Sequence, residues 1–111
     1  MRSSEQYERL LHTCGVSLHA LSISEIALER SDALVGVELL RRDGIAILGG
    51  DVYVKSGTTI EPAYANWYTD PKVGEGSEDY LSRSWTSAEE YIKKYPAPVS
   101  GTPLFVIVAG H

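Results

Sequence analysis

The amino-acid sequence predicts a single α+β domain over residues 1–111, with a mainly antiparallel sheet of three or four strands packed with about three helices. Three observations support this fold class. Several segments repeat apolar residues every three or four positions, as one face of a helix requires. Two β-rich runs follow each other with only a short turn between them, which is typical of a hairpin. The run from Leu104 to Ala109 is apolar throughout, as in a central strand covered on both faces.

The first helix is expected over residues 4–14, where apolar side chains follow a helical spacing: Tyr7, Leu10, Leu11 and Cys14. Gly15 would end it. This spacing places Cys14 on the buried stripe, where a thiol is inert. A single cysteine forms no internal disulfide, which fits a reducing compartment.

The second helix is expected to begin at a capping box, Ser22–Glu25, and to continue from Ile26 on one apolar face. It should end at Asp43 and Gly44, because a glycine readily adopts the left-handed conformation that ends a helix. Positive charges just before this point would offset the partial negative charge of the last carbonyls.

The predicted hairpin joins a bent strand at residues 45–54 to a second strand from about Thr59 to Tyr68. Gly49 and Gly50 interrupt the first strand, where we expect a bulge or the close approach of another backbone or an aromatic ring. Pro62 cannot donate a ladder hydrogen bond, so the second strand is predicted to lie at an edge.

A loop is expected from Asp70 to Ser77 because of its glycines and charges. The capping box Thr86–Glu89 then predicts the start of a third helix, which Pro96 would stop. Residues 78–85 fit either a helix or a strand. The apolar segment from Leu104 to Ala109 completes the sheet.

The inventory of reactive side chains argues against an enzyme and predicts no cofactor. His12, Cys14 and His19 lie close in sequence, but three ligands without a fourth match no strong metal spacing, so no metal site is expected. Gly49-Gly50-Asp51 falls within a β pattern and does not open a helix, unlike a phosphate-binding loop. No histidine occurs between residues 20 and 110 to serve as a general base.

The charge and hydropathy of the chain limit the classes of partner that it is expected to bind. Fifteen acidic and ten basic residues give a formal charge of −5, which opposes nucleic-acid binding. Such a charge favours encounter with a basic protein partner, but it also occurs in proteins that are acidic for solubility alone. The longest apolar run is far shorter than the ~20 residues of a membrane-spanning helix, so no membrane contact is expected. The first residues lack the apolar run of a secretory signal, which predicts a cytoplasmic protein.

The remaining candidate site is a protein-contact surface in the second hairpin strand and the loop after it, formed by Glu61, Trp67, Tyr68 and Asp70. Aromatic residues are enriched among interface hot spots, and acids at the rim steer a basic partner. Because successive strand residues point to opposite faces, Trp67 and Tyr68 cannot both belong to the core of a regular strand buried on one side. One of them should be available to a partner.

Three features together resemble the immunity protein 40 family of bacterial polymorphic toxin systems. They are the segment Ala46–Tyr53, the run Asn66-Trp67-Tyr68, and the spacing of Tyr80, Ser84, Ala88, Tyr91 and Ile92. The resemblance spans roughly residues 25–109. It implies a non-catalytic cytoplasmic antidote that binds and blocks a cognate toxin C-terminal domain in competition between bacteria.

Two other functions stay open. One is a small ligand-binding domain or enzyme with a cleft near Gly49-Gly50-Asp51. The other is an accessory subunit of a larger assembly. The scarcity of histidine favours the immunity protein over the enzyme.

Overall fold

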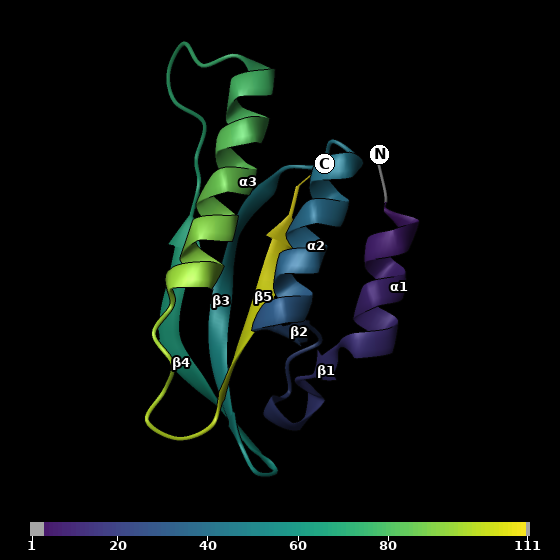
Figure 1. Ribbon diagram of the computed structural model, residues 1–111, viewed down its shortest axis with the longest axis vertical. Coiled ribbons are helices and arrows are strands. Elements are labelled where there is room, and N and C mark those ends of the chain that lie inside the picture. Colours follow the sequence, from purple (N-terminus) through teal and green to yellow (C-terminus); the bar gives the residue numbers. More distant parts are fainter. Residues whose placement is uncertain (1–3, 111) are drawn as a thin grey trace.

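The computed structural model describes residues 4–110, which form three α-helices, a short 3-10 helix and five strands (Figure 1). Along the chain these are α1 (Glu5–Cys14), β1 (Val16–Ser17), η1 (His19–Leu21), β2 (Ile26–Glu29), α2 (Arg30–Arg42), β3 (Ile47–Ser56), β4 (Thr59–Tyr68), α3 (Ser77–Lys94) and β5 (Thr102–Ala109). All neighbouring strands are antiparallel, in the order β1-β2-β5-β3-β4. The predicted α+β class is confirmed, with five strands in the sheet where three or four were expected.

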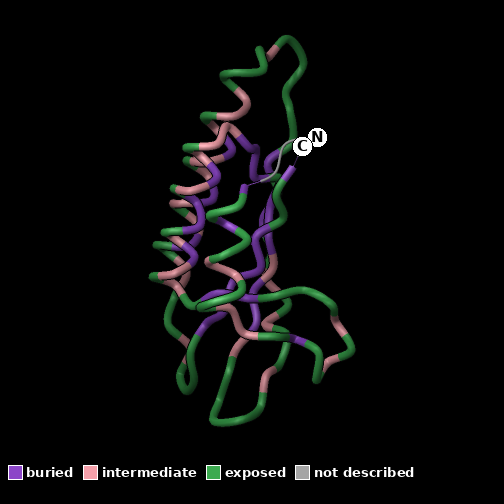
Figure 2. Tube along the Cα trace, turned by 90° about the vertical axis from the view of Figure 1, so that its right-hand side faces the viewer, coloured by how far each residue is buried: buried purple, intermediate pink, exposed green. Residues whose placement is uncertain are grey.

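The three α-helices cover the same face of the sheet (Figures 1 and 2). Their apolar sides meet the strands in the main core, which includes Val37 and Leu40 of α2, Ala88 and Ile92 of α3, and Val52 and Phe105 of the sheet. A hydrogen bond also links α3 to β3, because the buried Oγ of Ser84 accepts from the Ile47 N–H at 3.1 Å.

Strand β5 lies in the middle of the sheet and is buried on both faces, as its apolar sequence predicts. Phe105 and Ile107 face the helices, whereas Leu104 and Val106 belong to a second core on the opposite face. Segment 16–23 covers this second core with Leu18 and its neighbours. Segment 16–23 covers only part of the sheet face opposite the α-helices, and the rest of this face is exposed.

The predicted start of the second helix is wrong. Residues Ile26–Glu29 form strand β2, and α2 begins only at Arg30. Leu28 pairs with Phe105 of β5, and the adjacent Ala27 and Leu28 are buried in the two different cores. This opposite burial is that of a strand covered on both faces, so pairing with β5 overrides the local capping signal of Ser22–Glu25.

The predicted end of this helix is confirmed. Helix α2 ends at Arg42, and Gly44 adopts the left-handed conformation with φ of 67°. The N–H of Ile45 then donates to the Leu40 carbonyl at 2.9 Å, which leads the chain directly into β3.

The predicted start of the third helix at Thr86 is also wrong, because α3 begins at Ser77. For residues 78–85, which fit either a helix or a strand, the helical alternative is confirmed. Its inward face runs without interruption through Leu81, Ser84, Trp85 and Ala88. Thr86 lies exposed in mid-helix, where it caps nothing. The helix ends at Lys94, just before Pro96, as expected.

The predicted burial of Cys14 is wrong as well, because this residue is exposed at the end of α1. Tyr7 is the buried member of the predicted stripe, and Leu10 and Leu11 are half-buried. The short helix meets the domain mainly through its first two turns, so the last turn presents Cys14 to solvent.

The hairpin prediction is confirmed. Strand β4 spans Thr59–Tyr68 at an edge of the sheet, as expected, whereas β3 spans Ile47–Ser56 and is shifted by two residues from the predicted 45–54. Gly57, with φ of 61°, lies in the turn between the strands. The β3–β4 register shifts between Val52 and Tyr53, where Ala63 and Tyr64 form a bulge opposite β3. Tyr64 has φ of 57° within this bulge.

Candidate functional site

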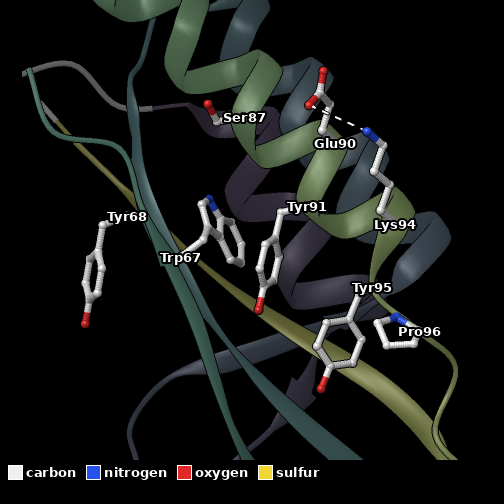
Figure 3. A pocket seen from close by; sticks show the side chains of 8 residues that line it. All are labelled: Trp67, Tyr68, Ser87, Glu90, Tyr91, Lys94, Tyr95 and Pro96. Atoms are coloured by element: carbon white, nitrogen blue, oxygen red, sulfur yellow. Dashed lines mark ion pairs between the residues drawn. The ribbon is translucent and has the colours of Figure 1, made fainter.

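The candidate site lies around the last residues of edge strand β4, where two neighbouring aromatic side chains point to opposite faces of the sheet (Figure 3). Trp67 points toward α3 and is 7% exposed, whereas Tyr68 points away from the helices and is 75% exposed. The expected division between a core residue and a free residue is thus confirmed, with Trp67 in the core and Tyr68 at the surface.

The glycines of β3 make room for Trp67. A Cβ at Gly50 would collide with the indole ring and with the Val106 carbonyl. A Cβ at Gly49 would collide with the Trp67 carbonyl oxygen. The β3–β5 register also shifts between Ile47 and Gly49. Both the predicted irregularity and the predicted close approach of a ring and a backbone are therefore present.

A groove of about 580 Å³ runs between β4 and α3 (Figure 3). It is lined mainly by aromatic and apolar groups, with Trp67, Ser87, Tyr91, Lys94, Tyr95 and Pro96 among them. The Trp67 and Tyr91 rings stack with centroids 4.7 Å apart, and burial raises the pKa of Tyr91. The Lys94 ammonium lies 4.0 Å from the Glu90 carboxylate. The buried Nε1 of Trp67 has no hydrogen-bond partner within residues 4–110.

On the opposite face, the part of the sheet that segment 16–23 leaves open carries a shallow hollow of about 230 Å³. We call this surface the open face, defined by Leu48, Gly49, Asp51, Tyr68, Asp70 and Val108. Leu48, Tyr68 and Val108 are exposed apolar or aromatic side chains, and the two aspartates stand beside them. The surface therefore combines apolar and aromatic side chains with two acidic ones.

The loop that carries Asp70 is tied to α3 by Arg83. The Arg83 guanidinium donates to both carboxylate oxygens of Glu75 at 2.9 and 2.8 Å and to the Asp70 carbonyl at 2.6 Å. The hydrogen bonds from Arg83 to the Glu75 carboxylate, followed by the one from the Lys72 N–H, lower the pKa of Glu75 to about 2. The Tyr80 hydroxyl also donates to the Thr69 carbonyl at 2.7 Å. The loop backbone next to Tyr68 is thus held in place from α3.

The structure brings together only part of the predicted contact set. Tyr68 and Asp70 meet on the open face, and Trp67 forms a wall of the groove behind them. Glu61 is exposed near the other end of β4, beyond the bulge. The sequence analysis does not predict Leu48 and Val108 as surface residues of this site. Each follows a buried residue, Ile47 or Ile107, and the alternation of strand side chains is the signal that would identify them. Tyr64, 90% exposed, was also left out of the set.

Within residues 4–110 no group of three or more His, Cys, Asp and Glu side chains is placed to hold a metal ion. His12, Cys14 and His19 are each exposed. In the same part of the chain, no helix combines the length and the apolar character needed to cross a membrane.

Comparison with known proteins gives one match. The family model described as "Immunity protein 40" matches residues 17–109, from β1 to the end of β5. No curated protein and no solved structure matches the chain. The family match covers strands β2 to β5 and both long helices, including the open face and the groove. The chain therefore belongs to the immunity protein 40 family.

Proposed function

We propose that this chain is an immunity protein that binds a cognate bacterial toxin domain and blocks it. The family match over residues 17–109 is the observation that carries the proposal. Neutralisation by binding requires a complementary surface and no catalytic group. The protein acts in the cytoplasm of the producing cell, which it protects from its own toxin and from that of its kin.

We place the toxin contact on the open face, centred on Tyr68. An exposed tyrosine beside Leu48 and Val108 offers a large contact area at low entropic cost. Asp51 and Asp70 on the same surface, together with the net charge of −5, favour a basic toxin. Arg83 restrains the Asp70 backbone before binding, which reduces the ordering cost of the complex.

The same observations disfavour a small ligand at Gly49-Gly50-Asp51. The hollow there is about 230 Å³, below the range of roughly 300–1,000 Å³ typical of ligand sites. Two glycines and the side chains of Leu48 and Val108 are among the residues that line it. A protein side chain fills such a hollow better than a separate substrate does.

The proposal predicts that the gene directly preceding that of this chain encodes a C-terminal toxin domain, and the test is coexpression of the two. We expect the chain to restore growth and to copurify with the toxin domain. Tyr68→Ala should weaken the complex by about 2 kcal/mol or more, as measured by calorimetry. The matched control is Tyr64→Ala, which removes a tyrosine of the same strand that is outside the open face.

Growth arrest despite coexpression, with no complex in pull-down, would refute the proposed function. Equal affinity of the Tyr68→Ala and Tyr64→Ala variants would leave the function intact and move the contact surface elsewhere.

A further inference from the structure

The outer edge of β4 has backbone groups without a strand partner. The N–H of Thr69 donates to the Leu48 carbonyl at 2.9 Å, and the Trp67 carbonyl lies against Gly49. Both groups therefore face β3. Because backbone direction alternates along a strand, the N–H and C=O of Asn66 and Tyr68 face outward. No other strand within residues 4–110 pairs with this edge, because β4 ends the sheet.

Only the end of β4 near Tyr68 suits an added strand. Toward the hairpin turn, Pro62 and the bulge at Ala63 and Tyr64 break the regular edge. Such features are common protections against unwanted pairing. From Ala65 to Tyr68 the register with β3 is regular, and this stretch contains neither proline nor lysine.

The groove between β4 and α3 lies directly beside this regular stretch (Figure 3). Trp67, Tyr91 and Tyr95 make it largely aromatic, and its charged Lys94 is paired with Glu90. On the other side of the strand, Tyr68 and Asp70 border the open face. A strand added to the edge would therefore direct alternate side chains to an apolar groove on one face and toward Asp70 on the other.

We propose that β4 receives an extended segment of the toxin as an additional strand, bonded to the backbone of Asn66 and Tyr68. The segment places an apolar side chain in the groove beside Trp67 and a basic side chain toward Asp70. This inference rests on the proposed function for the identity of the partner. It adds backbone pairing to the side-chain contacts of the open face.

The first experiment measures amide hydrogen exchange in the free protein and in its complex with the toxin domain encoded by the preceding gene. The N–H groups of Asn66 and Tyr68 should exchange rapidly in the free protein and at least about tenfold more slowly in the complex. The N–H of Thr69, already bonded to Leu48, serves as the internal reference.

The second experiment removes one outward donor. Asn66→Pro deletes an N–H that faces away from β3, so the β3–β4 ladder is retained. Asn66→Ala is the matched control, since it deletes the side chain and keeps the donor. We expect the proline variant to bind the toxin domain at least about tenfold more weakly than the alanine variant, at similar thermal midpoints. If the proline variant does not fold, the exchange measurement on the native protein decides.

The outcomes separate the two proposals. A complex in which the exchange of Asn66 and Tyr68 is unchanged refutes strand addition and leaves the proposed function standing. The absence of any complex refutes the proposed function itself. Protection of these amides in the free protein that grows with its concentration would assign the edge to a second copy of this chain and overturn the proposal.

Discussion

Trp67 and Tyr68 are adjacent aromatic residues, and the alternation of strand side chains gives them opposite roles. Trp67 stacks on Tyr91 inside the domain, while Tyr68 stands 75% exposed on the open face. The sequence predicts the division of roles but not its direction, because both residues have similar propensities. The direction agrees with the position of Gly50 in β3, where the absence of a side chain leaves space for the Trp67 indole.

Trp67→Ala should therefore destabilise the domain by about 3–5 kcal/mol, the usual cost of deleting a buried large aromatic side chain. Urea unfolding monitored by circular dichroism measures this change. Tyr68→Ala is the matched control and should stay within about 0.5 kcal/mol of the native protein, as an exposed residue does. Equal destabilisation by the two variants would contradict the assignment of faces.

Gly50→Ala should lower stability by at least about 1–3 kcal/mol, because the new methyl group would displace the Trp67 ring or the Val106 carbonyl. Gly76→Ala provides the comparison, since the nearest atom to a Cβ there is 3.8 Å away. Thermal unfolding of both variants checks the expectation. A Gly50→Ala variant as stable as Gly76→Ala would show that the ring is not held over this glycine.

Cys14 illustrates a limit of periodicity at the residue scale. Its spacing from Tyr7 and Leu10 is helical, yet the core does not reach the last turn of α1. Whether a stripe is buried along its whole length depends on the neighbouring element, which the spacing does not specify. Cys14→Ser should change the free energy of unfolding by less than about 0.5 kcal/mol, measured by denaturant titration. A loss of stability several times larger would contradict the exposed position of the Cys14 side chain.

At the scale of elements, the sequence predicts strand and helix identity well where the pattern is long. The hairpin, the central β5 and the end of α2 all follow from local signals. The two capping boxes mislead for different reasons. After Ser22–Glu25 the residues pair with the edge of β5 and form strand β2 instead of a helix. At Thr86 the buried face of α3 continues on both sides of the residue, so no helix begins there. In both cases tertiary contacts outweigh a local capping signal.

The loop before α3 supplies a prediction about pH. The carboxyl group of Glu75 titrates near 4.5 in the unfolded chain and near 2 in the folded protein, where Arg83 stabilises the carboxylate. A lowered folded pKa gives stability that is present above the unfolded pKa and lost as the pH falls through the folded one. Glu75→Gln should thus lower the thermal midpoint at neutral pH, and the difference from the native protein should shrink between pH 4.5 and 2.

The salt-bridge partner provides the control for this pH effect. Arg83→Gln removes the donor and should return the pKa of Glu75 toward its ordinary value, as followed by NMR titration of the carboxyl carbon. A Glu75 pKa that is unchanged in the Arg83→Gln variant would contradict the stated cause.

At the scale of the whole molecule, the distribution of the helices determines which surface is free. All three α-helices cover one face of the sheet, and segment 16–23 covers only part of the other (Figure 2). The open face and the β4 edge are the consequence, and both meet at Tyr68. Sequence reasoning found Tyr68 and Asp70 from composition, but it could not place Leu48 and Val108 beside them. Their proximity arises from the β3–β5 pairing of residues distant in the chain.

The net charge of −5 leads to the last prediction, which concerns the rate of toxin association. Long-range attraction between an acidic protein and a basic partner accelerates encounter, and salt screens it over a Debye length of about 8 Å at physiological ionic strength. Association should therefore slow as salt increases, while dissociation changes less. Asp70→Asn should reduce the association rate more than Glu5→Gln on α1, although each removes one negative charge. Stopped-flow mixing at several salt concentrations measures both rates, and an association rate that is independent of salt would exclude charge steering.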